Sequence, residues 1–177
     1  MNGHVYPDSV ARQLSSARAQ APLHLEREGS RFVRVEPQAD GVLAELHCDR
    51  GAVQGDLDGD GDLDLIVAEL GAPLRVLENG SQGRALEVRL EQPGVGNREG
   101  LGALVTLYTD GGVQRRWLVS GVGYQSCSPA VAHFGLGVAA PQRLEILWPD
   151  GELSELVLEA SGGRVVVERG PDSVRVR

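Results

Sequence analysis

The stretch that decides the fold is DLDGDGDLDLIVA, residues 56–68, in which an acidic loop runs directly into a short apolar segment. Residues 65–68 are rich in β-branched side chains and are soon followed by Gly71 and Pro73, a pattern typical of a buried strand. An EF-hand would need a bidentate acid at loop position 12, where this chain has Val67. The loop is therefore predicted to join two strands and not two helices.

The acidic loop itself predicts a calcium site, because so many neighbouring carboxylates would repel one another without a cation. Ca²⁺ takes 6–8 oxygen ligands at about 2.3–2.6 Å, and side chains at loop positions 1, 3, 5 and 9 with a glycine at position 6 suit it. Asp62, at position 7, would offer only its backbone carbonyl and point its side chain to solvent. An ordinary solvated turn rich in Asp and Gly is the alternative. The predicted metal residues are Asp56, Asp58, Asp60, Asp62 and Asp64.

Composition excludes two classes of partner. The 177 residues carry 25 acidic and 17 basic side chains, a formal charge of −8. The sequence contains no stripe of basic residues that could follow a phosphate backbone, which argues against nucleic-acid binding. No apolar run approaches the roughly 18–20 residues of a membrane span. The first residues do not resemble a secretory signal, so we expect any export signal to lie elsewhere, or the chain to begin partway through a longer protein.

Short alternating segments separated by turn residues predict an all-β chain. Residues 1–20 are predicted to be irregular, with a loop or a loosely held helix. Strands are predicted at 23–27, 31–35, 52–55, 63–68 and 74–78, within a segment 21–82 that has the pattern of one or two partial β-propeller blades.

A second series of strands is predicted to form a β-sandwich or barrel-like domain over residues 83–170. Leu86, Val88 and Leu90 alternate with charged residues, which is typical of a half-buried strand. Residues 171–177 are predicted to be a frayed tail. The further predicted strands are 103–109, 113–119, 131–134, 143–148, 153–158 and 164–168, with hairpin turns at 110–112 and 149–151.

Several segments of this second half match one known family in order. They are Asn97-Arg98-Glu99-Gly100-Leu101-Gly102-Ala103, Ser120-Gly121, Tyr124-Gln125-Ser126, His133-Phe134-Gly135-Leu136-Gly137 and Trp148-Pro149-Asp150-Gly151. Together they resemble the ASPIC/UnbV domain, and residues 55–70 resemble the calcium loop of an FG-GAP or VCBS-type propeller repeat. The order of the two is similar to the C-terminal part of the cartilage acidic protein family. The resemblance implies a secreted calcium-binding protein, with a calcium loop in the repeat.

Most of the matched residues are predicted to be structural. The glycines fit tight turns or bulges, and His133 fits a hydrogen-bonded residue at the edge of a β core. Trp148 is predicted to end a strand, with its indole in the core and its N–H bonded to one partner. Cys48 and Cys127 match no metal or redox motif, and whether they pair is left open.

Three hypotheses for function follow. The first is a calcium-binding extracellular binding or adhesion module, not an enzyme, whose partner is a protein or a glycan, or further propeller blades. The second is an enzyme or accessory protein of secondary-metabolite biosynthesis of the enediyne type, which would need a deep pocket lined by His133, Tyr124 and Glu145. The third is an end-cap for a longer propeller.

Overall fold

The computed structural model describes residues 13, 17–81, 83–159, 162–171 and 173–177. The chain forms two compact units that interleave along the sequence. The first contains Met1–Val53, Leu65–Leu77 and Gly123–Ser126, and the second contains Gln54–Asp64, Glu78–Val122 and Cys127–Arg177. Most of the segment 1–20, predicted to be irregular, lies outside the described residues.

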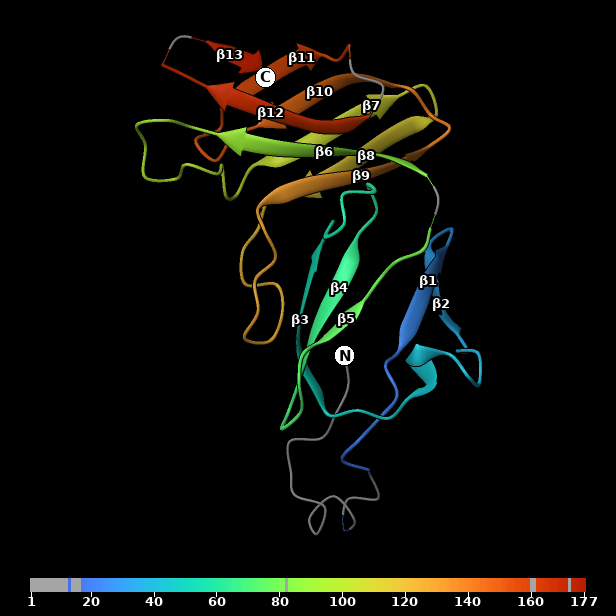
Figure 1. Cartoon of the computed structure of the whole chain (residues 1–177). Coiled ribbons are helices and arrows are strands. Elements are labelled where there is room, and N and C mark those ends of the chain that lie inside the picture. Colours follow the sequence, from blue (N-terminus) through green and yellow to red (C-terminus); the bar gives the residue numbers. More distant parts are fainter. Residues whose placement is uncertain (1–12, 14–16, 82, 160–161, 172) are drawn as a thin grey trace. The chain divides into compact units, whose positions relative to one another are not determined.

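The first unit holds a hairpin and a three-stranded sheet (Figure 1). The hairpin pairs β1 (His24–Glu28) with β2 (Arg31–Val35) in antiparallel register, close to the strands predicted at 23–27 and 31–35. After a short 3₁₀ turn, Val42–Ala44, the sheet follows in the order β3-β4-β5, formed by Asp49–Gly55, Asp64–Glu69 and Arg75–Leu77. The apolar run after the acidic loop is thus a strand, and its Val67 is fully buried. The propeller assignment of this sheet stays a prediction.

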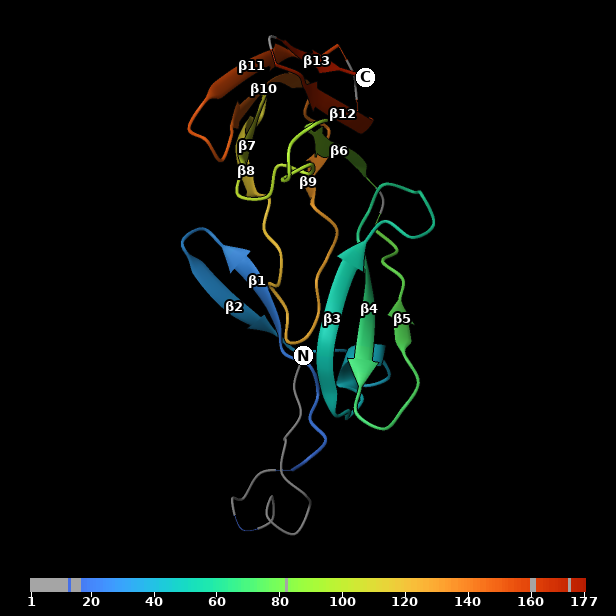
Figure 2. The same cartoon turned by 90° about the vertical axis from the view of Figure 1, so that its left-hand side faces the viewer.

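The second unit is built from two four-stranded sheets, which lie as two layers in Figure 2. One sheet has the order β11-β10-β7-β8, formed by Leu153–Val157, Pro141–Leu147, Leu104–Thr109 and Gly112–Trp117. The other has the order β13-β12-β6-β9, formed by Val174–Val176, Gly163–Arg169, Arg84–Glu91 and Val131–Gly137. Neighbouring strands are antiparallel, except that β12 runs parallel to β6.

One apolar core draws on both sheets. Alternate residues of β6 enter it, as predicted, whereas Arg89 between them is exposed. Glu87 is the exception to the alternation, because Arg164 on the parallel neighbour β12 donates to its carboxylate at 2.7 Å and the pair allows burial. The largest fully buried side chains of the core are Trp148, Phe134, Leu86, Leu107, Leu118, Leu144 and Ile146.

The two sheets form a sandwich and not a closed barrel. Strands β8 and β9 lie at the edges of different sheets, and side chains bridge them where a barrel would need a backbone ladder. Gln114 Nε2 donates to the carbonyl of Gly135 at 2.8 Å, and Arg116 Nε donates to the carbonyl of His133 at 3.0 Å. Of the two architectures that the sequence leaves open, the structure shows the sandwich.

The C-terminal residues are ordered where a frayed tail is predicted. Residues 174–176 form β13, which pairs antiparallel with β12. Val174 packs against the core, and Arg175 and Arg177 both donate to the carboxylate of Glu168, at 2.6 and 2.8 Å. Within the described residues no helix is both long enough and apolar enough to cross a bilayer.

Candidate metal centre

The acidic loop lies between β3 and β4, as the sequence predicts, and residues 54–64 belong to the sandwich unit. Carboxylate oxygens of Asp56, Asp58 and Asp60 lie within 4.8 Å of one another. Two oxygens bound to one Ca²⁺ at about 2.3–2.6 Å can be at most roughly 5 Å apart, so this spacing suits a shared ion. The loop therefore brings together the first three predicted ligands.

Backbone hydrogen bonds hold these carboxylates in place. Asp56 Oδ1 accepts from the N–H of Gly59 at 2.7 Å, Asp58 Oδ1 from Asp60 at 3.2 Å and Asp60 Oδ1 from Asp62 at 3.0 Å. Gly61 has a φ of 96°, a conformation that glycine adopts without strain. Each of the three carboxylates thus uses one oxygen in a backbone hydrogen bond of the turn.

Asp64 has a different environment. Its side chain is only 2% exposed, and both oxygens accept backbone hydrogen bonds at 2.9 Å, from the N–H groups of Asn79 and Leu57. These two hydrogen bonds, that of Asn79 first, hold the pKa of Asp64 below its ordinary value. Asp64 therefore closes the base of the loop as an ionised carboxylate. Its role as a ligand stays a prediction.

The side chain of Asp62 does not point to solvent, so that expectation is wrong. Asp62 is 9% exposed, and its Oδ2 accepts a hydrogen bond from Ser81 Oγ at 2.9 Å. Its Oδ1 is buried and accepts no hydrogen bond from the described part of the chain. A buried oxygen without a donor is costly, so the loop interior favours a cation. Ser81 is 19 residues away, and loop spacing alone gives no signal of it.

His133 on β9 forms a hydrogen bond with this loop. Its Nε2 lies 2.8 Å from the carbonyl oxygen of Gly61, which requires that Nε2 carry the proton. The ring is half-buried, and the contact fits the structural role predicted for it. A histidine held in this way is not poised as a general base at Nε2.

The residues of the enzymatic hypothesis belong to different elements. Tyr124 belongs to the first unit and is 60% exposed. Glu145 lies on β10, in the sheet that does not contain His133, and accepts a hydrogen bond from the Tyr108 hydroxyl at 3.3 Å. Cys48 and Cys127 are both free thiols.

Trp148 lies where the sequence predicts. It is 2% exposed and part of the sandwich core, directly after β10. Its indole N–H donates to Ser154 Oγ at 2.9 Å. The prediction of a core indole with one hydrogen-bond partner is confirmed.

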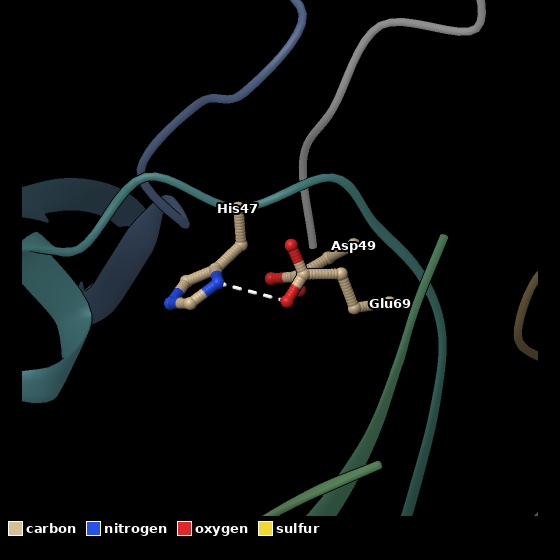
Figure 3. Close-up of side chains that lie close together, drawn as sticks. All are labelled: His47, Asp49 and Glu69. Carbon is tan, nitrogen blue, oxygen red and sulfur yellow. Dashed lines mark hydrogen bonds and ion pairs between the residues drawn. The ribbon is translucent and has the colours of Figure 1, made fainter. Parts of the chain in front are cut away.

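Sequence reasoning missed a second group of possible ligands, which lies in the first unit. His47, Asp49 and Glu69 bring one ring nitrogen and two carboxylate oxygens within 4.8 Å of one another (Figure 3). The i, i+2 spacing of His47 and Asp49 is a weak signal of a shared strand face. Glu69 is 20 residues beyond Asp49, and only the pairing of β3 with β4 brings it near.

Comparison with known proteins identifies the second half of the chain. Residues 94–174 match the family model described as ASPIC and UnbV. This chain carries an ASPIC/UnbV domain. The matched range covers most of the sandwich, from the loop after β6 to the start of β13, and confirms the resemblance of the glycine, His133 and Trp148 motifs.

The chain also matches curated relatives, but over only a small part of their length. The chain is 38% identical over 108 residues to cartilage acidic protein 1 of Mus musculus, covering 58% of this chain and 17% of that protein. Cartilage acidic protein 1 of Homo sapiens is 36% identical over 107 residues, with 58% and 16% covered. The chain thus spans about one sixth of these relatives. The FG-GAP or VCBS assignment of residues 21–82 stays a prediction.

Proposed function

We propose that this chain is a calcium-stabilised binding or adhesion module that works outside the cell and is not an enzyme. The observation that carries the proposal is the convergence of three aspartate side chains in a loop between two strands, with their oxygens within 4.8 Å. The cluster offers only hard oxygen ligands, which suit Ca²⁺ and do not favour softer transition metals. Asp56, Asp58 and Asp60 would hold the ion.

The ion would have a structural role. It would offset the repulsion of the aspartates and fix the loop between β3 and β4, which His133 and Asn79 also contact. Binding to the folded state alone stabilises it by RT ln(1 + [L]/Kd), about 2.7 kcal/mol when the free ion is a hundredfold above its dissociation constant.

The calcium level outside the cell and the names of the relatives support an extracellular role. Extracellular calcium modules bind at roughly 10⁻⁴–10⁻³ M, a range in which a cytosolic site would stay empty. The relatives of this chain are named cartilage acidic protein 1. Cartilage is a tissue whose matrix is extracellular, and the name also refers to an acidic protein. The formal charge of −8 agrees with that name.

A hollow in the sandwich unit offers a recognition surface. It has a volume of about 440 Å³ and is lined by both ends of the acidic loop and by strands β8 and β9. Trp117 at its rim is 59% exposed, and Arg116 and Arg164 are further lining residues. Exposed tryptophan and arginine are the side chains most enriched at binding hot spots. A protein or glycan partner, or further propeller repeats, would fit this surface.

The absence of catalysis is part of the proposal. His133 donates to the Gly61 carbonyl, and Glu145 accepts from Tyr108, so both of these titratable candidates already have structural partners. Within the part of the chain that the structure describes, neither has a hydrogen bond to a nucleophilic side chain of the kind that acid–base catalysis uses.

Thermal unfolding with calcium and with chelator tests the proposal. In about 10 mM Ca²⁺ the wild type should gain roughly 1.4–2.7 kcal/mol, and its melting temperature should rise by about 3–10 °C. Asp58→Asn should lose most of this rise, because it removes one ligand charge and retains the oxygen that accepts from the Asp60 amide.

Asp40→Asn is the matched control, since it removes one exposed carboxylate outside the loop. It should keep the full calcium-dependent rise. An equal rise in all three proteins would show that calcium acts elsewhere, and no rise in the wild type would reject the calcium site.

A further inference from the structure

His47, Asp49 and Glu69 form a candidate site that the calcium loop does not explain. Asp49 begins β3 and Glu69 ends β4, so neighbouring strands carry the two carboxylates, and His47 precedes β3 by two residues. Figure 3 shows both carboxylates on the same side of the imidazole. We propose that these three side chains bind a divalent transition-metal ion of the zinc type.

The donor set selects the class of ion. One imidazole nitrogen with two carboxylate oxygens suits zinc and its neighbours, whereas calcium prefers oxygen alone. His47 Nδ1 and Glu69 Oε2 are 2.9 Å apart. Two ligands on a tetrahedral Zn²⁺, each at about 2.0–2.1 Å, lie roughly 3.3 Å apart. A shift of a few tenths of an ångström would therefore let the ion replace the proton between them.

Asp49 supplies an independent sign of a missing partner. It is 2% exposed, and Arg75 Nη2 donates to its Oδ1 at 2.6 Å. Its other oxygen, Oδ2, is buried and has no hydrogen-bond partner in the described part of the chain. Leaving a buried carboxylate oxygen without a donor is costly, and a coordinated cation removes that cost.

The local charge also favours a cation. Glu45 joins Asp49 and Glu69 around His47. Among the described residues, Arg75 pairs with Asp49 and Glu69, and Arg50 Nη1 donates to the carbonyl oxygen of Asp49 at 2.8 Å. Three carboxylates and two guanidinium groups leave a net negative charge when the imidazole is neutral, as a metal ligand must be, and a bound cation would offset it.

The surroundings of His47 have the arrangement found around metal-bound histidines. Such a ring usually donates its second N–H to a carboxylate, which fixes its tautomer. Here Nδ1 faces Glu69, and Nε2 lies 3.0 Å from Glu45 Oε2. Glu69 is fixed in turn, because its Oε1 accepts from the amide of Cys48 at 3.2 Å.

Zinc titration of the metal-stripped chain tests the proposal, with about 10 mM Ca²⁺ present so that the acidic loop is saturated. Calorimetry should give one Zn²⁺ per chain for the wild type. His47→Gln should weaken this binding more than tenfold. Glu45→Ala, which changes only an exposed side chain, should weaken it by about 10–100-fold through loss of the ring's outer partner.

His24→Gln is the matched control, because His24 is an exposed histidine that also lies near a carboxylate, 3.8 Å from Glu26. It should leave zinc affinity unchanged, as should Asp58→Asn. In ¹⁵N NMR spectra of the wild type, zinc should change the chemical shift of His47 Nδ1. This measurement does not depend on whether His47→Gln folds. No stoichiometric zinc binding, zinc binding that His24→Gln removes, or an unperturbed His47 ring would each overturn the proposal.

Discussion

Gly100 is where a turn of the ASPIC/UnbV domain comes closest to its core. Its φ is 62°, and an added Cβ would lie 2.9 Å from Leu90 Cδ1 and 3.2 Å from Leu90 Cβ. Leu90 is 2% exposed and cannot move outward. Gly100→Ala should therefore lower the free energy of unfolding by roughly 2–4 kcal/mol, the sum of left-handed backbone strain and overpacking. Urea unfolding followed by circular dichroism measures this loss.

Gly135→Ala provides the comparison. Gly135 lies on β9, has no positive φ, and an added Cβ would meet nothing within 4 Å. Its substitution should change stability by no more than about 0.5 kcal/mol. Equal losses in the two variants would contradict the steric explanation for Gly100.

At the residue scale, the sequence predicts the burial and the neighbours of a side chain well when both depend on nearby residues in the chain. The burial of Trp148 follows from its place at a strand end, and the three clustered aspartates follow from loop spacing. Asp62 was misjudged because its partner, Ser81, comes from a distant part of the chain. The grouping of His47 with Glu69 was missed for the same reason, since strand pairing creates it.

At the scale of elements, the docking of β13 on β12 should depend on pH. Arg175 and Arg177 donate to Glu168 and hold its pKa below the ordinary value of 4.5. A carboxylate whose pKa is lower in the folded chain than in the unfolded chain stabilises the folded state at pH values above the unfolded pKa. This stabilisation is lost as the pH falls through the folded pKa. The amides of residues 174–176 should thus lose protection from hydrogen exchange, after correction for intrinsic rates, when pH falls from neutral to below 4.5.

Glu168→Gln separates this effect from general acid unfolding. The variant should have low protection of β13 at neutral pH and little further loss on acidification. Glu159→Gln, at an exposed glutamate of the same unit, should behave like the wild type. The explanation fails if β13 of Glu168→Gln still loses protection with pH as the wild type does.

The same element shows where strand prediction reaches its limit. Turn residues and short β-rich segments located the other strands, and in β6 and β9 the alternate burial of residues follows the period of two in the sequence. β13 is only three residues long, Val174–Val176, and its docking relies on Glu168 and on the packing of Val174. The parallel pairing of β12 with β6 joins residues about 77 apart, and periodicity carries no signal of it.

At the scale of the whole molecule, the two compact units interleave along the sequence. The predicted boundary near residue 82 treats the chain as two consecutive segments, and it stays a prediction. Residues 54–64 belong to the unit that contains the ASPIC/UnbV domain, with His133 bonded to Gly61 and Asn79 to Asp64. His47, Asp49 and Glu69 belong to the other unit. The two proposed ion sites are therefore assigned to different units, although β3 and β4 pass through both.

This assignment predicts that calcium and zinc protect different parts of the chain. Because an ion stabilises the structure that must form to bind it, Ca²⁺ should slow hydrogen exchange of peptides covering residues 54–64. Zn²⁺ should instead slow exchange at residues 45–49 and 66–70. Exchange measured by mass spectrometry with each ion alone gives the map, with Asp58→Asn and His47→Gln each expected to erase one pattern and keep the other. If both ions protected the same peptides, or if either variant erased both patterns, the two sites would not be independent and one of the assignments would have to be abandoned.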